Sequence, residues 1–253
     1  MKNLSLITAF LFFTVWCQAQ SAFPKFTMYA DGGFSVPVGE SYSLDSYALA
    51  GPRFNLGGDF NFKSGVTIGL SYSMAVHSYD ATLAANDLLE QNSLFYDLTP
   101  LSAIVEATPY QQGSFLINLG YKKMLNDKFG LDGKFGFGIN GFVTPEVEYA
   151  VVYNDPSGLN QKQIGAIESV AGAGTMMNFD LGLNYHVSQK WGVRIGLGYG
   201  ITTMDYDAGV YITEFDDDEI YTAASATVND VIEASWLNAS IGLTYSFGKR
   251  AQE

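Results

Sequence analysis

The chain has 253 residues, of which 47% are hydrophobic, 15% are aromatic and only 15% are charged. Disordered chains are rich in charge and poor in aromatic residues, so this composition argues against disorder. The 26 acidic and 13 basic residues give a net charge of −13. That charge would repel a polyanion and predicts no nucleic-acid partner. A single Cys argues against a disulfide framework and a thiolate metal site.

Residues 1–20 have the features of a secretory signal peptide. Lys2 supplies the positive charge, and an apolar run too short to span a bilayer comfortably follows it. Small residues near the end predict cleavage after Ala19, with cleavage after Gln20 as the alternative. A lipoprotein signal acylated at Cys17 is the competing interpretation, although that site needs small residues and Trp16 precedes it.

The mature chain, residues 20–253, is predicted to form one domain that is periplasmic, secreted or inserted in an outer membrane as a β-barrel. It has no run of 18 or more apolar residues, the length of a transmembrane helix. Eight segments instead alternate between apolar and small or polar residues, which predicts β-strands. Each is roughly 10–12 residues long, enough for a tilted strand to cross a bilayer. They begin near Phe26, Phe54, Val66, Phe115, Phe129, Met177, Trp191 and Leu237.

The connections between these segments alternate in length. Short turns are predicted at residues 63–64, 126–128 and 188–190. The long connections run over residues 37–51, 77–112, 143–174 and 203–233. Three short turns and four long loops are the pattern of an all-β, eight-stranded, antiparallel up-and-down transmembrane β-barrel with long outer loops and both termini at the short-turn end.

The two faces of the predicted strands favour a membrane barrel over a soluble one. A lipocalin-like barrel would place apolar residues inside, whereas here the alternate face carries Gly, Ser, Thr, Asn and single charges, which suit a narrow polar lumen. Outward aromatic residues near the short turns predict a belt at the membrane interface. The belt comprises Phe26, Phe62, Tyr121, Phe129, Tyr185, Trp191, Tyr245 and Phe247.

Eight charged residues fall on the predicted lumen face, four of each sign. Unpaired charges in a narrow barrel would be costly, so we expect them to pair with one another. A salt-bridged plug and a small gated pore are both compatible with such a network, although eight strands leave little more space than their own side chains fill. The residues are Asp31, Arg53, Asp59, Lys122, Asp132, Lys134, Asp180 and Arg194.

The last predicted strand ends in the aromatic pattern Leu243-Thr-Tyr245-Ser-Phe247, followed by GKRAQE. With the eight strands, this pattern resembles the outer membrane β-barrel domain family, the OmpA/OmpX-like, porin-family proteins of Gram-negative bacteria. The resemblance implies an outer-membrane location with both termini in the periplasm, and insertion by the barrel-insertion machinery. It also implies contact with outer-membrane lipid and lipopolysaccharide. We expect the barrel to be a monomer.

The long connections are where binding functions usually lie. The third and fourth are predicted to form hairpins that continue beyond the membrane, and the second contains a predicted helix over residues 82–90. A projecting sheet could pair its edge with a partner strand. The sequence therefore predicts a structural or surface-interaction role, such as adhesion to a surface ligand or partner protein, with a narrow porin-like channel as the alternative.

An acidic run in the fourth loop is a candidate cation contact or a bridge to lipopolysaccharide. Its spacing is not that of an EF-hand, and a solvated acidic loop tip is the plainer interpretation. We therefore expect neither a metal site nor a cofactor. The run comprises Asp216, Asp217, Asp218 and Glu219.

A lipid A-modifying enzyme is the remaining alternative. Such chemistry needs a positioned base and nucleophile. His77 and His186 are the two His residues of the chain. Ser78 follows His77, but adjacent strand residues point to opposite faces, which places Ser78 badly for nucleophilic attack. We therefore predict no catalytic residue and no enzymatic activity.

Overall fold

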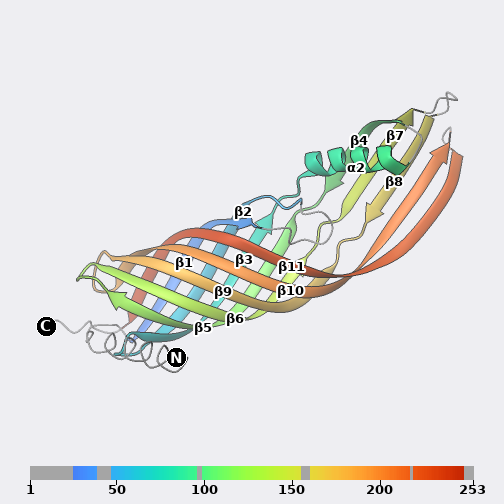
Figure 1. Ribbon diagram of the computed structural model, residues 1–253. Coiled ribbons are helices and arrows are strands. Elements are labelled where there is room, and N and C mark those ends of the chain that lie inside the picture. Colours follow the sequence, from blue (N-terminus) through green and yellow to red (C-terminus); the bar gives the residue numbers. More distant parts are fainter. Residues whose placement is uncertain (1–24, 39–46, 96–98, 155–159, 217–218, 248–253) are drawn as a thin grey trace, which may run out of the picture.

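The computed structural model describes residues 25–38, 47–95, 99–154, 160–216 and 219–247, which form eleven strands and one helix (Figure 1). Eight of these strands form a closed antiparallel barrel, as the sequence predicted. They are β1 (Phe26–Pro37), β2 (Gly51–Asn61), β3 (Val66–His77), β5 (Tyr110–Met124), β6 (Phe129–Val143), β9 (Ala171–His186), β10 (Trp191–Asp216) and β11 (Glu219–Phe247).

The barrel closes where the first strand pairs with the last. Twelve residues of β1 lie opposite β11, from Phe26 beside Phe247 to Pro37 beside Trp236. Every other barrel strand pairs with its sequence neighbours in the barrel, so the topology is up-and-down throughout. No barrel strand is therefore left with an unpaired edge inside the membrane.

The three predicted short turns connect barrel strands at one end. Gly65 has a φ of 89°, which its missing Cβ permits. The side chain of Asn126 accepts a 2.9 Å hydrogen bond from the Phe129 amide, and the Ser188 hydroxyl accepts one of 3.0 Å from the Trp191 amide. Turn residues that accept local backbone hydrogen bonds fix the strand register on both sides.

The barrel strands are apolar outside and polar inside, as predicted. On β3 the outward Leu70 and Met74 are each 50% exposed, whereas Thr67, Ser71 and Ser73 are buried in the lumen. Large apolar side chains cover the outer wall on every barrel strand. Hydrocarbon solvates such a surface and water does not, so the structure supports a membrane barrel over a lipocalin-like one.

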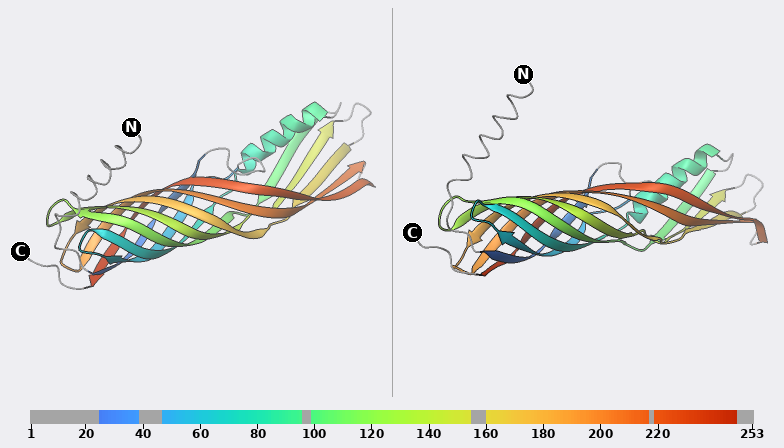
Figure 2. Two further views of the ribbon diagram at one scale, coloured as in Figure 1. Left: turned by 60° about the horizontal axis from the view of Figure 1, so that its bottom comes forward. Right: turned by 90° about the horizontal axis from the view of Figure 1, so that it is seen from below.

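Beyond the end opposite the short turns, five strands form a projecting sheet that we call the outer sheet. The distal parts of β10 and β11 continue from the barrel wall, and β8 (Asn160–Ile167), β7 (Val147–Asn154) and β4 (Thr99–Ala107) extend it in that order. Figure 2 shows the outer sheet continuing one side of the barrel. The two predicted hairpins are confirmed, whereas β4 was not predicted.

Helix α2 (Ala81–Phe95) packs on the outer sheet, chiefly against β4, and confirms the predicted helix (Figure 1). Asp80 caps it by accepting a 3.0 Å hydrogen bond from the Leu83 amide. The Tyr47 hydroxyl donates a 2.9 Å hydrogen bond to Asp87. Within the described residues, no helix combines the length and apolar character needed to cross a membrane.

Two adjacent glycines of β1 test the closure of the barrel. A Cβ on Gly33 would clash with the Ala239 carbonyl oxygen of β11, whereas a Cβ on Gly32 would have nothing within 4 Å. We expect Gly33→Val to lower the free energy of unfolding by about 3 kcal/mol because it forces the two strands apart. Gly32→Val should change it by less than about 1 kcal/mol.

The measurement is urea unfolding of refolded protein in detergent micelles. The heat-dependent gel shift of the folded barrel reports the fraction that remains folded. Equal losses of stability for the Gly33 and Gly32 variants would show that the contact between β1 and β11 does not limit stability.

Candidate functional site

Arg194 lies at the centre of the lumen and contacts three carboxylates from different strands. Its Nη1 is 3.2 Å from Asp31 Oδ2, its Nη2 is 3.0 Å from Asp132 Oδ2, and Nη2 also pairs with Asp180. Asn184 donates a hydrogen bond to Asp132. Because β1, β6, β9 and β10 supply these groups, the cluster connects strands across the barrel as well as around it.

A second ion pair fills the lumen beside the first. Lys134 Nζ lies 2.6 Å from Asp59 Oδ2, with both side chains almost fully buried. The same ammonium group stands 3.9 Å from the centroid of the Tyr29 ring, and the Arg194 guanidinium lies 5.8 Å from it. The Tyr29 ring therefore lies near both cations, an arrangement that cation–π attraction stabilises.

The structure places all eight predicted lumen charges on the inner face and brings six of them into these two groups. Lys122 is buried, and Arg53 is half-buried. Arg53 forms no ion pair within 4.0 Å among the described residues. These six charges therefore form one cation shared by three acids and one simple pair, an arrangement that the balance of four charges of each sign did not reveal.

The outer end of the lumen is apolar, which corrects the expectation of a polar inner face along the whole barrel. Large side chains from opposite walls meet there, and we call them the outer plug. Trp236, Phe142 and Met176 are each only 1% exposed. The cluster comprises Tyr110, Leu116, Phe142, Met176, Met204, Ala208, Ala234 and Trp236.

Two aromatic residues connect the outer plug with the core beneath α2. The Tyr79 ring stacks on Tyr110 of the plug, with centroids 6.1 Å apart, and its centroid also lies 5.3 Å from that of Tyr47. Tyr47 packs with Ala84 of α2 and Val105 of β4. The barrel mouth and the outer sheet thus share a continuous packed interior, which holds the sheet in a fixed position on the barrel.

The face of the outer sheet opposite α2 is open and mixed in character. Ile104 of β4 is 64% exposed, and Tyr211 of β10 is also exposed. The Tyr211 hydroxyl donates a 3.1 Å hydrogen bond to Glu168, and this bond raises the pKa of Tyr211 above its ordinary value. On β11 the uncharged edge segment 223–227 is exposed at every residue.

The predicted aromatic belt lies on the outer wall at the short-turn end. Its rings form a ladder across the closure, with Trp191 4.8 Å from Tyr245, Tyr245 4.8 Å from Phe247, and Phe247 5.7 Å from Phe26. A second pair follows on β6 and β9, where Phe129 and Tyr185 lie 5.1 Å apart. Phe62 is exposed and Tyr121 half-buried on the same surface.

The remaining candidates are only partly described. Asp217, Asp218 and the side chains of Asp216 and Glu219 lie outside the described residues, whereas the backbone of Asp216 pairs with Glu219 of β11 and with Gln161 of β8. Among the described residues, no group of three or more potential ligands could hold a metal ion.

The two His residues lie inside the barrel. His77 is fully buried, with Nδ1 3.2 Å from the Leu49 carbonyl oxygen, and His186 is buried near the short turns. Among the described residues, the hydrogen bond of the His77 ring is therefore to a backbone group and not to an acidic side chain.

Several solved structures are similar to this chain at low sequence identity, and no curated protein matches the sequence. Neisserial surface protein A is 12% identical, covering 88% of this chain and 97% of that chain with a TM-score of 0.44. Ail, the attachment invasion locus protein of Yersinia pestis, is 11% identical, covering 88% and 99% with a TM-score of 0.41. A major outer membrane protein from Thermus thermophilus is 14% identical, covering 88% and 98% with a TM-score of 0.43.

The family comparison covers almost the whole sequence. Residues 5–247 match the model of the outer membrane protein beta-barrel domain. That span includes all eight barrel strands, the outer sheet and α2. The closed barrel, its apolar outer wall and this match lead to one conclusion, that the chain belongs to the outer membrane protein beta-barrel domain family.

Proposed function

We propose that this protein is a non-enzymatic, monomeric outer-membrane barrel that presents the outer sheet as a rigid surface for binding a ligand or partner outside the cell. The observation that carries the proposal is the continuous packing from the outer plug through Tyr79 to the core beneath α2. A loop that needed only to connect strands would not require a five-stranded sheet, a helix and a shared core. Binding surfaces on rigid supports lose less entropy when a partner docks.

The orientation in the proposal follows from the lengths of the connections. Lys63, Lys128 and Lys190 lie in or beside the short turns, which we place in the periplasm together with both termini. The outer sheet then faces outward, where lipopolysaccharide and other cells are encountered. Its exposed Asp205 and Asp207 lie on β10 just beyond the apolar wall, where divalent cations would bridge them to anionic lipid.

The contacts across the lumen argue against the narrow channel. Arg194 and its three carboxylates occupy the middle of the lumen, and Trp236, Phe142 and Met176 fill the outer end. A solute would have to displace both layers. Eight-stranded barrels are narrow enough for side chains to fill the lumen, which fits a closed barrel better than an open one.

Electrical recording separates the closed barrel from the channel. We expect refolded wild-type protein in planar bilayers to give no steady single-channel current, and Asp180→Asn and Arg194→Gln to leave it silent or noisy without a defined open level. Folding is checked by the heat-dependent gel shift of the same preparation. Reproducible current in the wild type that changes in size with either substitution would contradict the closed barrel and support a pore.

The Arg194 cluster should stabilise the barrel. Arg194→Gln leaves three neighbouring carboxylates without their shared cation, so we expect the free energy of unfolding to fall by about 3–5 kcal/mol. Arg53→Gln is the matched control, because Arg53 also faces the lumen but lacks an ion pair among the described residues. Urea unfolding in lipid vesicles provides the measurement, and losses of equal size would refute the structural role of the cluster.

Surface binding is tested by removing part of the outer sheet. A short Gly-Ser linker replaces residues 147–167, which deletes β7 and β8 but leaves every barrel pairing intact. Bacteria that display the wild-type protein should adhere to immobilised extracellular-matrix extract, and bacteria with the deletion should lose most of that adhesion.

A finer variant, Ile104→Ser with Tyr211→Ser, changes exposed side chains without removing a strand. It should weaken adhesion if the open face makes the contact. The binding proposal fails if wild-type and deletion cells, with equal amounts of folded barrel, adhere to the matrix and to control surfaces in the same way.

A further inference from the structure

The apolar outer wall has a gap at Gly133 of β6. Outward positions on this strand carry Leu131 and Phe135 on either side, but Gly133 presents no side chain between them. A Cβ added there would meet only Leu181 Cδ2, at an ordinary 3.4 Å, and the backbone is not in the left-handed region. Neither packing nor backbone geometry requires this glycine, so the gap is a property of the surface.

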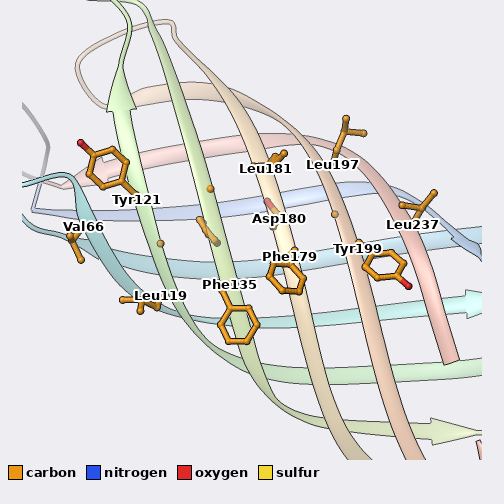
Figure 3. A pocket seen from close by; sticks show the side chains of 14 residues that line it. Val66, Leu119, Tyr121, Phe135, Phe179, Asp180, Leu181, Leu197, Tyr199 and Leu237 are labelled. Atoms are coloured by element: carbon orange, nitrogen blue, oxygen red, sulfur yellow. The ribbon is translucent and has the colours of Figure 1, made fainter. Parts of the chain in front are cut away.

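The gap widens into a groove of about 730 Å³ on the membrane-facing wall (Figure 3). Its volume lies within the range of ligand sites, and its accessible lining is almost entirely apolar. Because Gly133 has no side chain, its neighbours are strongly exposed: Leu181 is 69% exposed and Leu197 62% exposed. The side chains that form its walls include Leu119, Tyr121, Phe135, Phe179, Leu181 and Leu197.

A second groove of about 510 Å³ continues the first toward the short turns. The two share Tyr121, Gly133, Leu181 and Leu197, so they form one elongated depression. Lys123 lines the second groove. Lys123 is one residue before the end of β5 and lies opposite Leu131, two residues after β6 begins. The depression therefore has an apolar body and a cation at the end where the aromatic belt marks the membrane interface.

We propose that this depression is a binding site for one anionic phospholipid of the leaflet that contacts the short turns. One acyl chain lies along the groove over Gly133, and the phosphate is held near the Lys123 ammonium. This inference concerns the membrane-facing wall and is independent of the role of the outer sheet. It assigns a specific lipid to one side of a barrel whose other strands contact bulk lipid.

The hydrocarbon around the groove and the positive charge of Lys123 together favour an anionic phospholipid as the occupant. The groove lies on a wall that hydrocarbon solvates, so an acyl chain is the apolar group present at high concentration. Chains in bulk lipid are as apolar as Leu, so specific binding must come from close packing and from the ion pair with the headgroup. A second copy of the barrel fits less well, because a two-fold contact through the groove would bring two Lys123 ammonium groups into one interface.

The test compares two outward glycines on different strands, Gly133 of β6 and Gly32 of β1. Gly133→Leu fills the groove, and Gly32→Leu adds the same side chain to β1, where nothing lies within 4 Å. Lys123→Gln removes the cation and keeps a side chain of similar length. Each protein is refolded into vesicles of equal parts phosphatidylglycerol and phosphatidylcholine with identical chains, extracted into mild detergent and measured by native mass spectrometry. The heat-dependent gel shift confirms folding of every variant.

We expect wild type and Gly32→Leu to retain one phosphatidylglycerol molecule in preference to phosphatidylcholine. Retention should fall about tenfold in Gly133→Leu, which corresponds to the loss of roughly ten carbon–carbon contacts. Lys123→Gln should lose the preference for phosphatidylglycerol. Equal retention by the Gly133 and Gly32 variants, wild-type binding without headgroup preference, or a wild-type dimer in place of a lipid-bound monomer would each overturn the proposal.

Discussion

Backbone amide and carbonyl groups inside hydrocarbon have no water to bind, so a sheet that crosses a membrane must close on itself. Here β1 meets this requirement by pairing with β11 over twelve residues, and small inward residues let the two strands approach. Gly33 and Gly242 face backbone atoms of the opposite strand so closely that a Cβ would not fit. The eight-strand closure fixes the lumen width, and the lumen width then decides which side chains the interior can hold.

Side chains fill this narrow lumen, and their character changes along the barrel axis. In the middle, Arg194 shares its guanidinium among three carboxylates, which keeps buried charge hydrogen-bonded on several sides. At the outer end, Trp236 and Phe142 exclude water by packing. The ionic part holds strands in register, whereas the apolar part continues into the core beneath α2. The outer plug fills the outer end of the lumen and packs against Tyr79 and Ile167, which also contact the core beneath α2, so the barrel mouth and the outer sheet share one packed interior.

Alternation along the chain predicted the barrel because it depends on single strands. The alternation of apolar and small or polar residues from Trp191 to Ile201 predicts which residues face lipid. The turn residues Asn126 and Ser188 indicate where the strands reverse. Partners within the lumen were not predictable, since which Asp meets Arg194 depends on the stagger of four strands. Strand β4 was not predicted, and its pairing with β7, which is interrupted near Pro100, likewise depends on contacts distant in the sequence. The outer plug has a sequence signal, since Trp236 falls at an inward position beside outward Leu237, but alternation alone does not separate an apolar from a polar inner face.

The polarity of β10 reverses along its length, and this reversal locates the edge of the membrane. Up to Ile201 the outward side chains are apolar, but the next outward positions are Thr203, Asp205 and Asp207, all exposed. Over the same stretch the inward positions change from glycines and Arg194 to buried Met204 and Ala208. A strand that turns its apolar face from lipid to its own core has left the hydrocarbon layer. The outer sheet is therefore a water-exposed structure that shares its packed interior with the barrel mouth and is built on strands that begin inside the membrane. The change of outward side chains between Ile201 and Thr203 marks where β10 leaves the hydrocarbon layer.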